Sequence, residues 1–486
     1  MADRILLRGG HVLSMDDELG ELPGGDVLIE AGKIAAVAIG IDVEDAEVLD
    51  VAGHVVMPGF IDTHRHTWQT PFRGICADWT LEDYFRGIRM SISPNCSAED
   101  VYAGNYLGAL EALDAGVTTI LDFSHCNNTP EHADGALQGL LDAGIRAIFA
   151  YGYYPSPAAD PVFTEHSQRL DDARRIRERT LSSDDALVTM GLALTEVGLL
   201  PFEQTVAEAR SARDLGVPSV LHTGCHWGSL ITEGIPELDH HHLLDASQVH
   251  VHCNTLDDRD FRRLAENDCK VSSSPETEMQ MGMGHPVIRR ALEHGMRPSL
   301  SCDVMSSNSG DMFSQMRLGL QFERCMRNDS FNARNQMPDR LDLSVRDALR
   351  WGTANGAHAI GLEQRVGSLT PGKQADVIVV GGRRLNIVPM ADPVGCLVAQ
   401  ANPSNVQHVL VAGRFAKRDG VLLGVDVEHA IGLAGAACER VLGAIRDGGK
   451  ELLPPAPDGF ADLLNSIAAQ HLARAWAIEG QGAPAP

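Results

Sequence analysis

Eight short apolar runs recur between residues 54 and 303, and most are followed by polar or glycine-rich residues and then by a helix-like stretch. The runs are HVVMPGFIDTH, VTTILDF, IRAIFAYG, ALVTMGLAL, VPSVLHT, VHVHC, CKVSSSP and MRPSLSCD. Eight alternations of strand and helix are typical of an α/β chain that forms a (β/α)8 TIM-like barrel. Chemistry on such a barrel sits at the carboxyl ends of the strands, so the polar residues that end these runs are predicted to meet at one mouth.

Small antiparallel strands are predicted on both sides of the barrel, because residues 4–57 and 367–424 share short β-like runs separated by Gly and Asp turns. The shared pattern of short strands and turns in the two segments indicates one discontinuous β domain. The apolar spacing of residues 426–447 predicts a helix. The expected domains are a discontinuous β-sandwich (1–57 plus 365–425), a catalytic barrel (58–364), and a C-terminal helical extension with a flexible tail (426–486).

The charge balance restricts the partners of this chain. It has 66 acidic and 40 basic residues, for a formal net charge of −26, so its field repels phosphate backbones and anionic lipid head groups. Nucleic acid, membranes and polyanionic substrates are therefore not expected. The 10 cysteines include no CxxC pair, and no secretory leader or long uncharged apolar stretch occurs, which predicts a reduced, cytoplasmic protein.

Histidines and one aspartate end four of the eight runs. His64 and His66 are two residues apart on a predicted strand, so both imidazoles share one face. His222 ends the fifth run, His252 the sixth and Asp303 the eighth. A lone histidine at a strand end is more often structural. The prediction of a metal site rests on the placement of all these residues at strand ends of one barrel. Imidazoles and a carboxylate around one opening suit zinc or another borderline divalent ion.

The stretches MPGFIDTHRH, HVHCNTLDD, SLSCDVMSSNSGDMFSQMR and GSLTPGKQADVIVV resemble those of the amidohydrolase superfamily. The similarity is closest to its cytosine deaminase, S-adenosylhomocysteine deaminase and triazine hydrolase branch, over about residues 4–424. The resemblance implies one divalent metal ion, zinc with iron or manganese as alternatives, which makes water a nucleophile near neutral pH. His252 would orient that water and Asp303 would take its proton. The implied metal ligands are His64, His66, His222 and Asp303.

The same resemblance suggests substrate contacts. The stretch FRGICADWTLEDYF resembles the family's loop after the first strand, where Arg73 and Trp79 would border the pocket. His125 ends the second run and Trp227 follows the fifth, so we expect both at the mouth. Other aromatic residues near the ends of the first and fifth strands would form a wall suited to a ring. The family also implies a homodimer or larger homo-oligomer.

The positions of the lysines indicate whether the site could hold a second metal ion. Binuclear relatives use a bridging carboxylated lysine at the end of the fourth strand, and this chain has no lysine between Lys33 and Lys270. The bridge is therefore absent. A second ion held by Glu196 stays an alternative.

Two positions depart from the family pattern. Deaminating relatives have a glutamate three residues after the fifth-strand histidine, where it carries a proton to the leaving nitrogen, but Cys225 stands there in this chain. The thiol either fills space or takes part in catalysis, for which it is a poor acid near neutral pH. After the seventh run Glu278 replaces an asparagine, either as a solvated loop residue or as a regained catalytic carboxylate.

These observations predict a metal-dependent hydrolase that uses an activated water to cleave a C–N bond, as a deaminase or amidohydrolase, or a C–halide bond. Its substrate is expected to be a small, neutral or cationic heterocycle. A lyase or isomerase on the same mononuclear site is the enzymatic alternative, and a non-catalytic scaffold is the other. The zinc deaminase class with H-x-E and P-C-x-x-C motifs is excluded because neither motif occurs.

Overall fold

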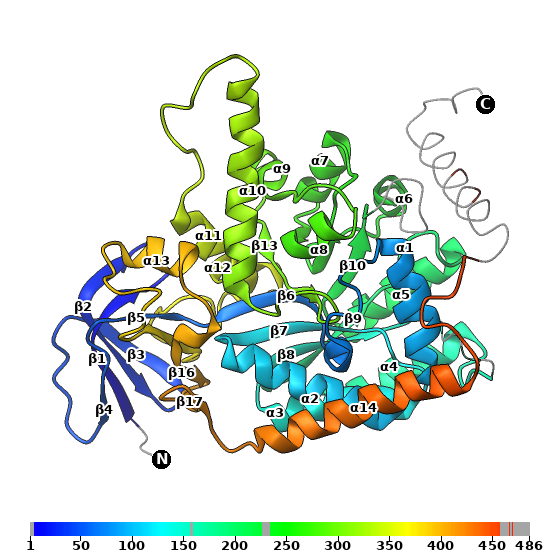
Figure 1. The fold of residues 1–486 in the computed structure, drawn as a ribbon, viewed down its shortest axis with the longest axis horizontal. Helices are drawn as coiled ribbons and strands as arrows, with labels where there is room; N and C mark the ends of the chain where they lie inside the picture. Colours follow the sequence, from blue (N-terminus) through cyan, green and yellow to red (C-terminus); the bar gives the residue numbers. More distant parts are fainter. Residues whose placement is uncertain are drawn as a thin grey trace.

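Parallel strands form a closed ring at the centre of the protein (Figure 1). The computed structural model describes residues 4–155, 158, 160–225, 234–456, 466 and 469. The last run supplies two short pieces, one pairing with the seventh run and one with the first, which closes the barrel. The predicted (β/α)8 barrel is therefore confirmed. Its strands, in chain order, are β6 (Phe60–His66), β7 (Val117–Ser124), β8 (Arg146–Gly152), β9 (Val188–Ala193), β10 (Ser219–Thr223), β11 (Gln248–His252), β12 (Lys270–Ser273), β13 (Ser299–Leu300) and β14 (Asp303–Val304).

Helices cover the outside of the ring, so the barrel strands are buried on both faces, as parallel sheets require. The long excursion after β6 contains four short helical segments before the first long helix, and it roofs part of the mouth. These segments are η1 (Thr67–Phe72), α1 (Leu81–Tyr84), the π-helix η2 (Phe85–Ile92) and η3 (Ser93–Asn95). The other helices up to the end of the barrel are α2 (Ala98–Asp114), α3 (Pro130–Ala143), α4 (His166–Arg179), α5 (Phe202–Leu215), α6 (Ile235–His240), α7 (Asp258–Glu266), α8 (Pro275–Gln280), α9 (Ile288–Glu293), α10 (Met312–Asn332), α11 (Val345–Trp351) and α12 (Ala354–Ala359).

A second sheet combines strands from both ends of the chain, at the left of Figure 1. Strand β5 (His54–Pro58) pairs in parallel with β1 (Arg4–Leu13) and antiparallel with β15 (Val377–Gly381), and this joins the two halves. The sheet is therefore mixed and discontinuous in sequence, while the domain limits stay predictions. Its other strands are β2 (Glu21–Glu30), β3 (Lys33–Ala38), β4 (Glu47–Asp50), β16 (Val406–Val411), β17 (Arg414–Arg418) and β18 (Val421–Leu422).

The predicted helix after the second sheet is confirmed as α14 (Val427–Asp447), which runs along α2 at the bottom of Figure 1. Asp426 caps it by accepting a hydrogen bond from the His429 amide at 3.0 Å. Two short segments, α13 (Pro393–Ala399) and η4 (Pro403–Asn405), precede it. Within the described part of the chain, no helix is long and apolar enough to cross a membrane.

Candidate active site

Strand β6 places two of the candidate ligands. His64 and His66 alternate with Arg65, whose buried guanidinium points the other way and bonds Glu111 at 2.8 Å and Asp62 at 3.4 Å. This buried network anchors the strand and turns both imidazoles toward the barrel mouth. The strand alternation expected from the sequence is therefore what positions the pair.

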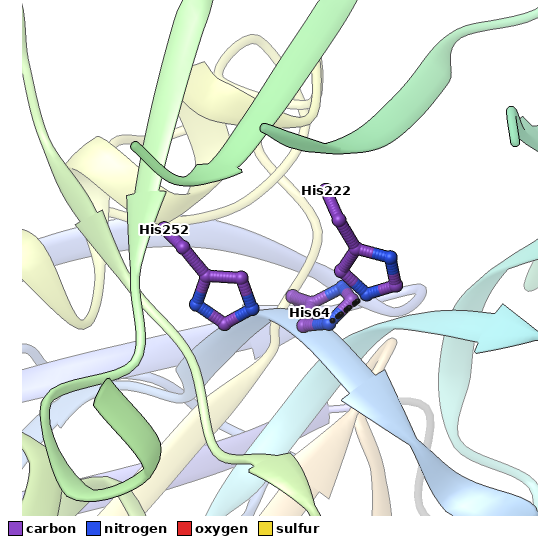
Figure 2. A group of neighbouring side chains, drawn as sticks. All are labelled: His64, His222 and His252. Atoms are coloured by element: carbon purple, nitrogen blue, oxygen red, sulfur yellow. Dashed lines mark hydrogen bonds between the residues drawn. The ribbon is translucent and has the colours of Figure 1, made fainter. Parts of the chain in front are cut away.

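Three imidazoles and one carboxylate converge on one point. Nε2 of His222 lies 3.2 Å from Nε2 of His64 and 3.3 Å from Nε2 of His66. Asp303 Oδ1 lies 3.1 Å and 3.3 Å from the same two His64 and His66 atoms. Figure 2 shows His64 and His222 meeting, with His252 beside them. A tetrahedral zinc ion with bonds of about 2.0–2.1 Å holds its ligands about 3.3 Å apart, so the spacing fits such an ion.

The protons on these imidazoles point away from the cluster. His66 Nδ1 faces the Phe123 carbonyl at 3.1 Å, and His222 Nδ1 faces the Glu196 carboxylate at 2.7 Å. Both partners accept hydrogen bonds, so Nδ1 carries the proton and Nε2 keeps its lone pair. Burial lowers the pKa of His64 to about 4 and holds that of His66 well below its usual value. Lone pairs of neutral imidazoles repel one another at this distance, and a bound cation removes that repulsion.

His252 lies beside the cluster, held by a buried carboxylate. Its Nδ1 is 3.2 Å from Glu278 Oε1 and its Nε2 is 3.7 Å from Asp303 Oδ2. Burial lowers the pKa of His252, but the Glu278 hydrogen bond and the Asp303 charge outweigh it, so the pKa is raised. His252 and Asp303 take φ of +76° and +62°, a left-handed conformation that is costly for these residues and is concentrated at functional sites.

Glu278 is fully buried on α8, so it is not a solvated loop residue. Its carboxylate accepts hydrogen bonds from Ser273 Oγ and the Ser274 amide, both at 2.7 Å. These contacts fix the carboxylate against His252. The regained carboxylate therefore touches the histidine rather than the open mouth.

Cys225 follows β10 and lines the cavity, with 1% of its surface exposed. Burial, and then the charge of Glu196, raise the pKa of its thiol well above the usual value. Cys225 is thus a neutral thiol near pH 7. Glu196 lines the same cavity: its Oε1 accepts hydrogen bonds from His222 and from the Tyr154 hydroxyl, while its buried Oε2 has no hydrogen-bond partner among the described residues.

His125 lines the cavity as expected, stacked on His66 with ring centroids 4.1 Å apart. Arg73 instead pairs with Glu111 at 2.6 Å, and neither Arg73 nor Trp79 is among the described residues lining the cavity. Trp227 lies outside the described residues. The remaining lining residues are Leu81, Tyr84, Phe85, Arg89, Tyr154, Thr277, Met281, Met283 and Val304.

Several of these lining residues were not predicted from the sequence, among them Tyr154 and Arg89. Tyr154 lies two residues beyond the end of β8, and a wider reading of that strand end would have found it. Arg89 gave no signal, because it lies on η2, far along the chain from the end of β6. Leu81, Tyr84 and Phe85 come from the same excursion as Arg89, so this segment supplies the cavity wall that Arg73 and Trp79 were expected to form.

A (β/α)8 barrel with three histidines and an aspartate converging at its strand ends defines a metal-dependent hydrolase. The chain belongs to the amidohydrolase family, whose profile matches residues 55–416. Enzymes of this kind act on carbon–nitrogen bonds other than peptide bonds.

Curated relatives match almost their whole length. A 5′-deoxyadenosine deaminase from Methanothermobacter thermautotrophicus is 27% identical over 91% of this chain and 99% of its own. A 5-methylthioadenosine/S-adenosylhomocysteine deaminase from Syntrophobacter fumaroxidans is 28% identical over 88% of this chain and 96% of its own.

Solved structures share the fold. A zinc-bound adenosine deaminase from Xanthomonas campestris superposes with a TM-score of 0.80 at 22% identity, covering 90% of this chain and 98% of its own. Atrazine chlorohydrolase TrzN from Arthrobacter aurescens TC1, complexed with zinc, gives a TM-score of 0.75 at 19% identity, covering 89% and 100%. At these identities the likeness establishes the fold, and the activities belong to those proteins.

Proposed function

We propose that this chain is a mononuclear zinc hydrolase that replaces an amino group on a carbon of a small nitrogen heterocycle. The observation that carries the proposal is the close approach, at 3.1–3.3 Å, of the ligand atoms of His222 and Asp303 to those of His64 and His66. The deaminase activity of the curated relatives supports the same reaction class. The cavity, walled by Phe85, Tyr84 and methionines, suits a flat ring.

The residues around the ligands divide the proton transfers among them. A bound divalent ion supplies the Lewis acid that makes water ionise near neutral pH. Asp303 takes the proton of the attacking water. It holds this proton on Oδ2, because Oδ2 is the carboxylate oxygen that faces Nε2 of His252. His252 receives that proton at Nε2 and delivers it to the departing nitrogen. Glu278 keeps His252 in the required orientation through Nδ1.

Displacement of a halide is the second candidate, and Cys225 is the observation that favours it. Ammonia is a poor leaving group unless it is protonated, whereas chloride leaves as an anion. The neutral Cys225 thiol cannot carry a proton as the family's glutamate does, and this loss affects the halide reaction less because chloride leaves without a proton. Release of ammonia or of chloride from matched ring substrates separates the two candidates.

The test begins with metal content. Elemental analysis of the purified protein should find about one zinc ion per chain, and His64→Ala should lose it. His240→Ala is the matched control, because His240 is an exposed histidine at the end of α6 and should leave metal content unchanged. Two tightly held ions would contradict the mononuclear site.

Turnover is then measured on aminated and halogenated pyrimidines, purines and triazines. Asp303→Asn should abolish it while keeping a fold of near-native stability, because the substitution removes the proton acceptor and preserves the shape. A fully active Asp303→Asn variant would remove this mechanism. Light scattering tests the homo-oligomer, which stays a prediction.

A further inference from the structure

The cavity contains a positively charged side chain that the reaction does not use. Arg89 lies on η2, and its Nη1 donates a hydrogen bond to the His125 carbonyl at 2.8 Å. Its guanidinium carbon lies 4.6 Å from the centre of the Tyr154 ring. The Tyr154 hydroxyl in turn lies 3.2 Å from Nδ1 of the ligand His222, so one side chain separates Arg89 from the ligand cluster.

These contacts hold Arg89 without neutralising it. A carbonyl oxygen and an aromatic face orient the guanidinium, but no carboxylate of the described chain forms an ion pair with it. The Nε and Nη2 groups make no hydrogen bond to a described residue. An arginine fork that is fixed on one side and open on the other presents donors to a ligand in the cavity.

A second arginine, Arg169, also has a donor group without a hydrogen-bond partner among the described residues. Arg169 on α4 is 3% exposed, and its Nη1 donates to the Asn127 carbonyl at 2.9 Å, while Nη2 has no hydrogen-bond partner among the described residues. Burial lowers the pKa of Arg169 most, the charge of Tyr151 raises it, and the charge of Arg89 lowers it. The charges of Asp172 and Glu208 raise the pKa of Arg169, so carboxylates lie within range of its guanidinium and only the Nη2 donor is left without a hydrogen-bond partner among the described residues.

The charges of the site leave a positive balance at this end. Among the described residues, the carboxylates that line the cavity are Asp303 and Glu196, and a divalent ion at the cluster would offset their two negative charges. Among the described lining residues, the charge of Arg89 is then the one that no other group balances. With that ion bound, the described lining residues would carry a net positive charge, although the whole chain carries a net charge of −26.

We propose that the substrate is a nitrogen heterocycle bearing an anionic oxygen group, a carboxylate or a phosphate, which Arg89 binds. This inference rests on the proposed function, because the reacting carbon of the same ring must lie at the ligand cluster. It differs from the neutral or cationic substrate expected from the net charge. It also separates this chain from enzymes whose substrates are uncharged nucleosides.

The test compares rings that differ only in charge. The neutral members are adenosine and cytosine, and the anionic members are adenosine 5′-carboxylate, adenosine 5′-monophosphate and 5-carboxycytosine. We expect the wild-type protein to favour the anionic members in kcat/KM. Arg89→Gln should lower kcat/KM for them by about 10- to 100-fold, the worth of a charge-assisted hydrogen bond, and change the neutral members by less than about threefold. A preference for carboxylate over monophosphate, or the reverse, identifies the anion.

Two variants separate charge from structure. Arg89→Lys keeps the charge and should retain part of the preference for anionic rings. Arg86→Gln is the matched control on the same π-helix, since Arg86 bonds Asp83 and the Pro454 carbonyl and is not among the described residues lining the cavity; it should change neither class. Equal losses for neutral and anionic rings in Arg89→Gln would assign Arg89 a structural role and overturn the inference.

A binding measurement keeps this result independent of turnover. Calorimetric titration of 5-carboxycytosine into the zinc-loaded Glu278→Gln variant, which keeps all four proposed ligands, should give binding that Arg89→Gln, added to that variant, weakens by about 10- to 100-fold. Cytosine should show no such dependence. Binding that depends on Arg89 without hydrolysis by the wild-type protein would refute the proposed reaction and leave the anion site standing. Hydrolysis of both ring classes with no dependence on Arg89 would refute the anion site alone.

Discussion

At the residue scale, burial decides the chemistry of Cys225. The thiol lies in the cavity that the family's proton-carrying glutamate would face, yet its pKa is raised by burial and by the nearby carboxylate of Glu196. A thiol in that state is neither a nucleophile nor an effective acid near pH 7. Cys225 therefore only fills space in the cavity, and Asp303 and His252 carry out the proton transfers.

Cys225→Ala should therefore change turnover on the preferred substrate by no more than a few-fold. Loss of a positioned general acid typically costs about 10²- to 10⁴-fold, so steady-state kinetics separate the two roles. A loss in that larger range would put the thiol in the chemistry. Cys225→Glu should introduce or raise deamination of amino-heterocycles, because it restores the carboxylate that deaminating relatives use.

Glu278→Gln should lower turnover more than Cys225→Ala does. The amide keeps the shape and can accept from the Ser274 amide, but it removes the negative charge that holds the proton of His252. We expect kcat to fall by about 10²- to 10⁴-fold with a small change in KM, as for loss of a positioned acid. Glu276→Gln is the control, since Glu276 lies on the same helix and bonds Ser309 and Gln315 instead. Equal, small effects in both variants would leave Glu278 a structural residue.

A buried carboxylate behind the site makes stability depend on pH. Glu208 is fully buried, and burial raises its pKa to about 8, against hydrogen bonds from the Thr195 amide and hydroxyl that lower it. The protonated form is favoured in the folded state, so its stabilisation is complete below the unfolded pKa near 4.5 and is lost as pH rises toward 8.

Glu208→Gln copies the protonated form, because the amide oxygen can accept from the Thr195 amide and its NH₂ can donate to the Thr195 hydroxyl. The free energy of unfolding of the variant, minus that of the wild type, should rise between pH 5 and 8 by at most about 1.4 kcal/mol per pH unit. Urea unfolding across this range measures it. A difference that stays flat with pH would mean that Glu208 titrates normally.

At the element scale, most of the correct predictions came from the patterns of the barrel strands. The eight apolar runs and their polar ends located β6, β10, β11 and β14, because burial on both faces leaves a continuous apolar signal. Residues brought in by long, irregular excursions gave no such signal. Arg89 lies on a π-helix whose place over the mouth depends on tertiary packing. The sequence left Glu278 as either a solvated loop residue or a regained carboxylate, because its full burial depends on the fold. Oligomeric state and cellular location stay predictions.

Helix α14 offers a test of packing at this scale. Its buried residues fall on one face, which packs along α2, while the neighbouring positions are exposed. Ala437 is 4% exposed and Ala436 is exposed. Ala437→Asp would bury a charge without a partner and should destabilise the protein by several kcal/mol or undock the helix, whereas Ala436→Asp should stay within about 0.5 kcal/mol. Thermal unfolding and proteolysis near residue 426 measure both. Identical behaviour of the two variants would show that α14 contributes little to the fold.

At the scale of the whole molecule, one buried ion pair joins the barrel to the second sheet. Arg146 at the start of β8 donates from Nε and Nη2 to the two carboxylate oxygens of Asp376, at 2.8 Å and 2.9 Å, and Asp376 immediately precedes β15. Both side chains are at most 3% exposed. Asp376 also accepts a hydrogen bond from the Ala412 amide at 2.8 Å, so it ties together barrel, β15 and the end of β16.

Removing one partner leaves the other charge buried and unpaired. Asp376→Asn and Arg146→Met should each cost about 3–5 kcal/mol in the free energy of unfolding. The double variant should cost clearly less than the sum, since both charges are gone and the asparagine oxygen can still accept from the Ala412 amide. Urea unfolding of the zinc-loaded protein gives all three values. Single variants within about 1 kcal/mol of the wild type would show that the apolar contacts alone join the two sheets.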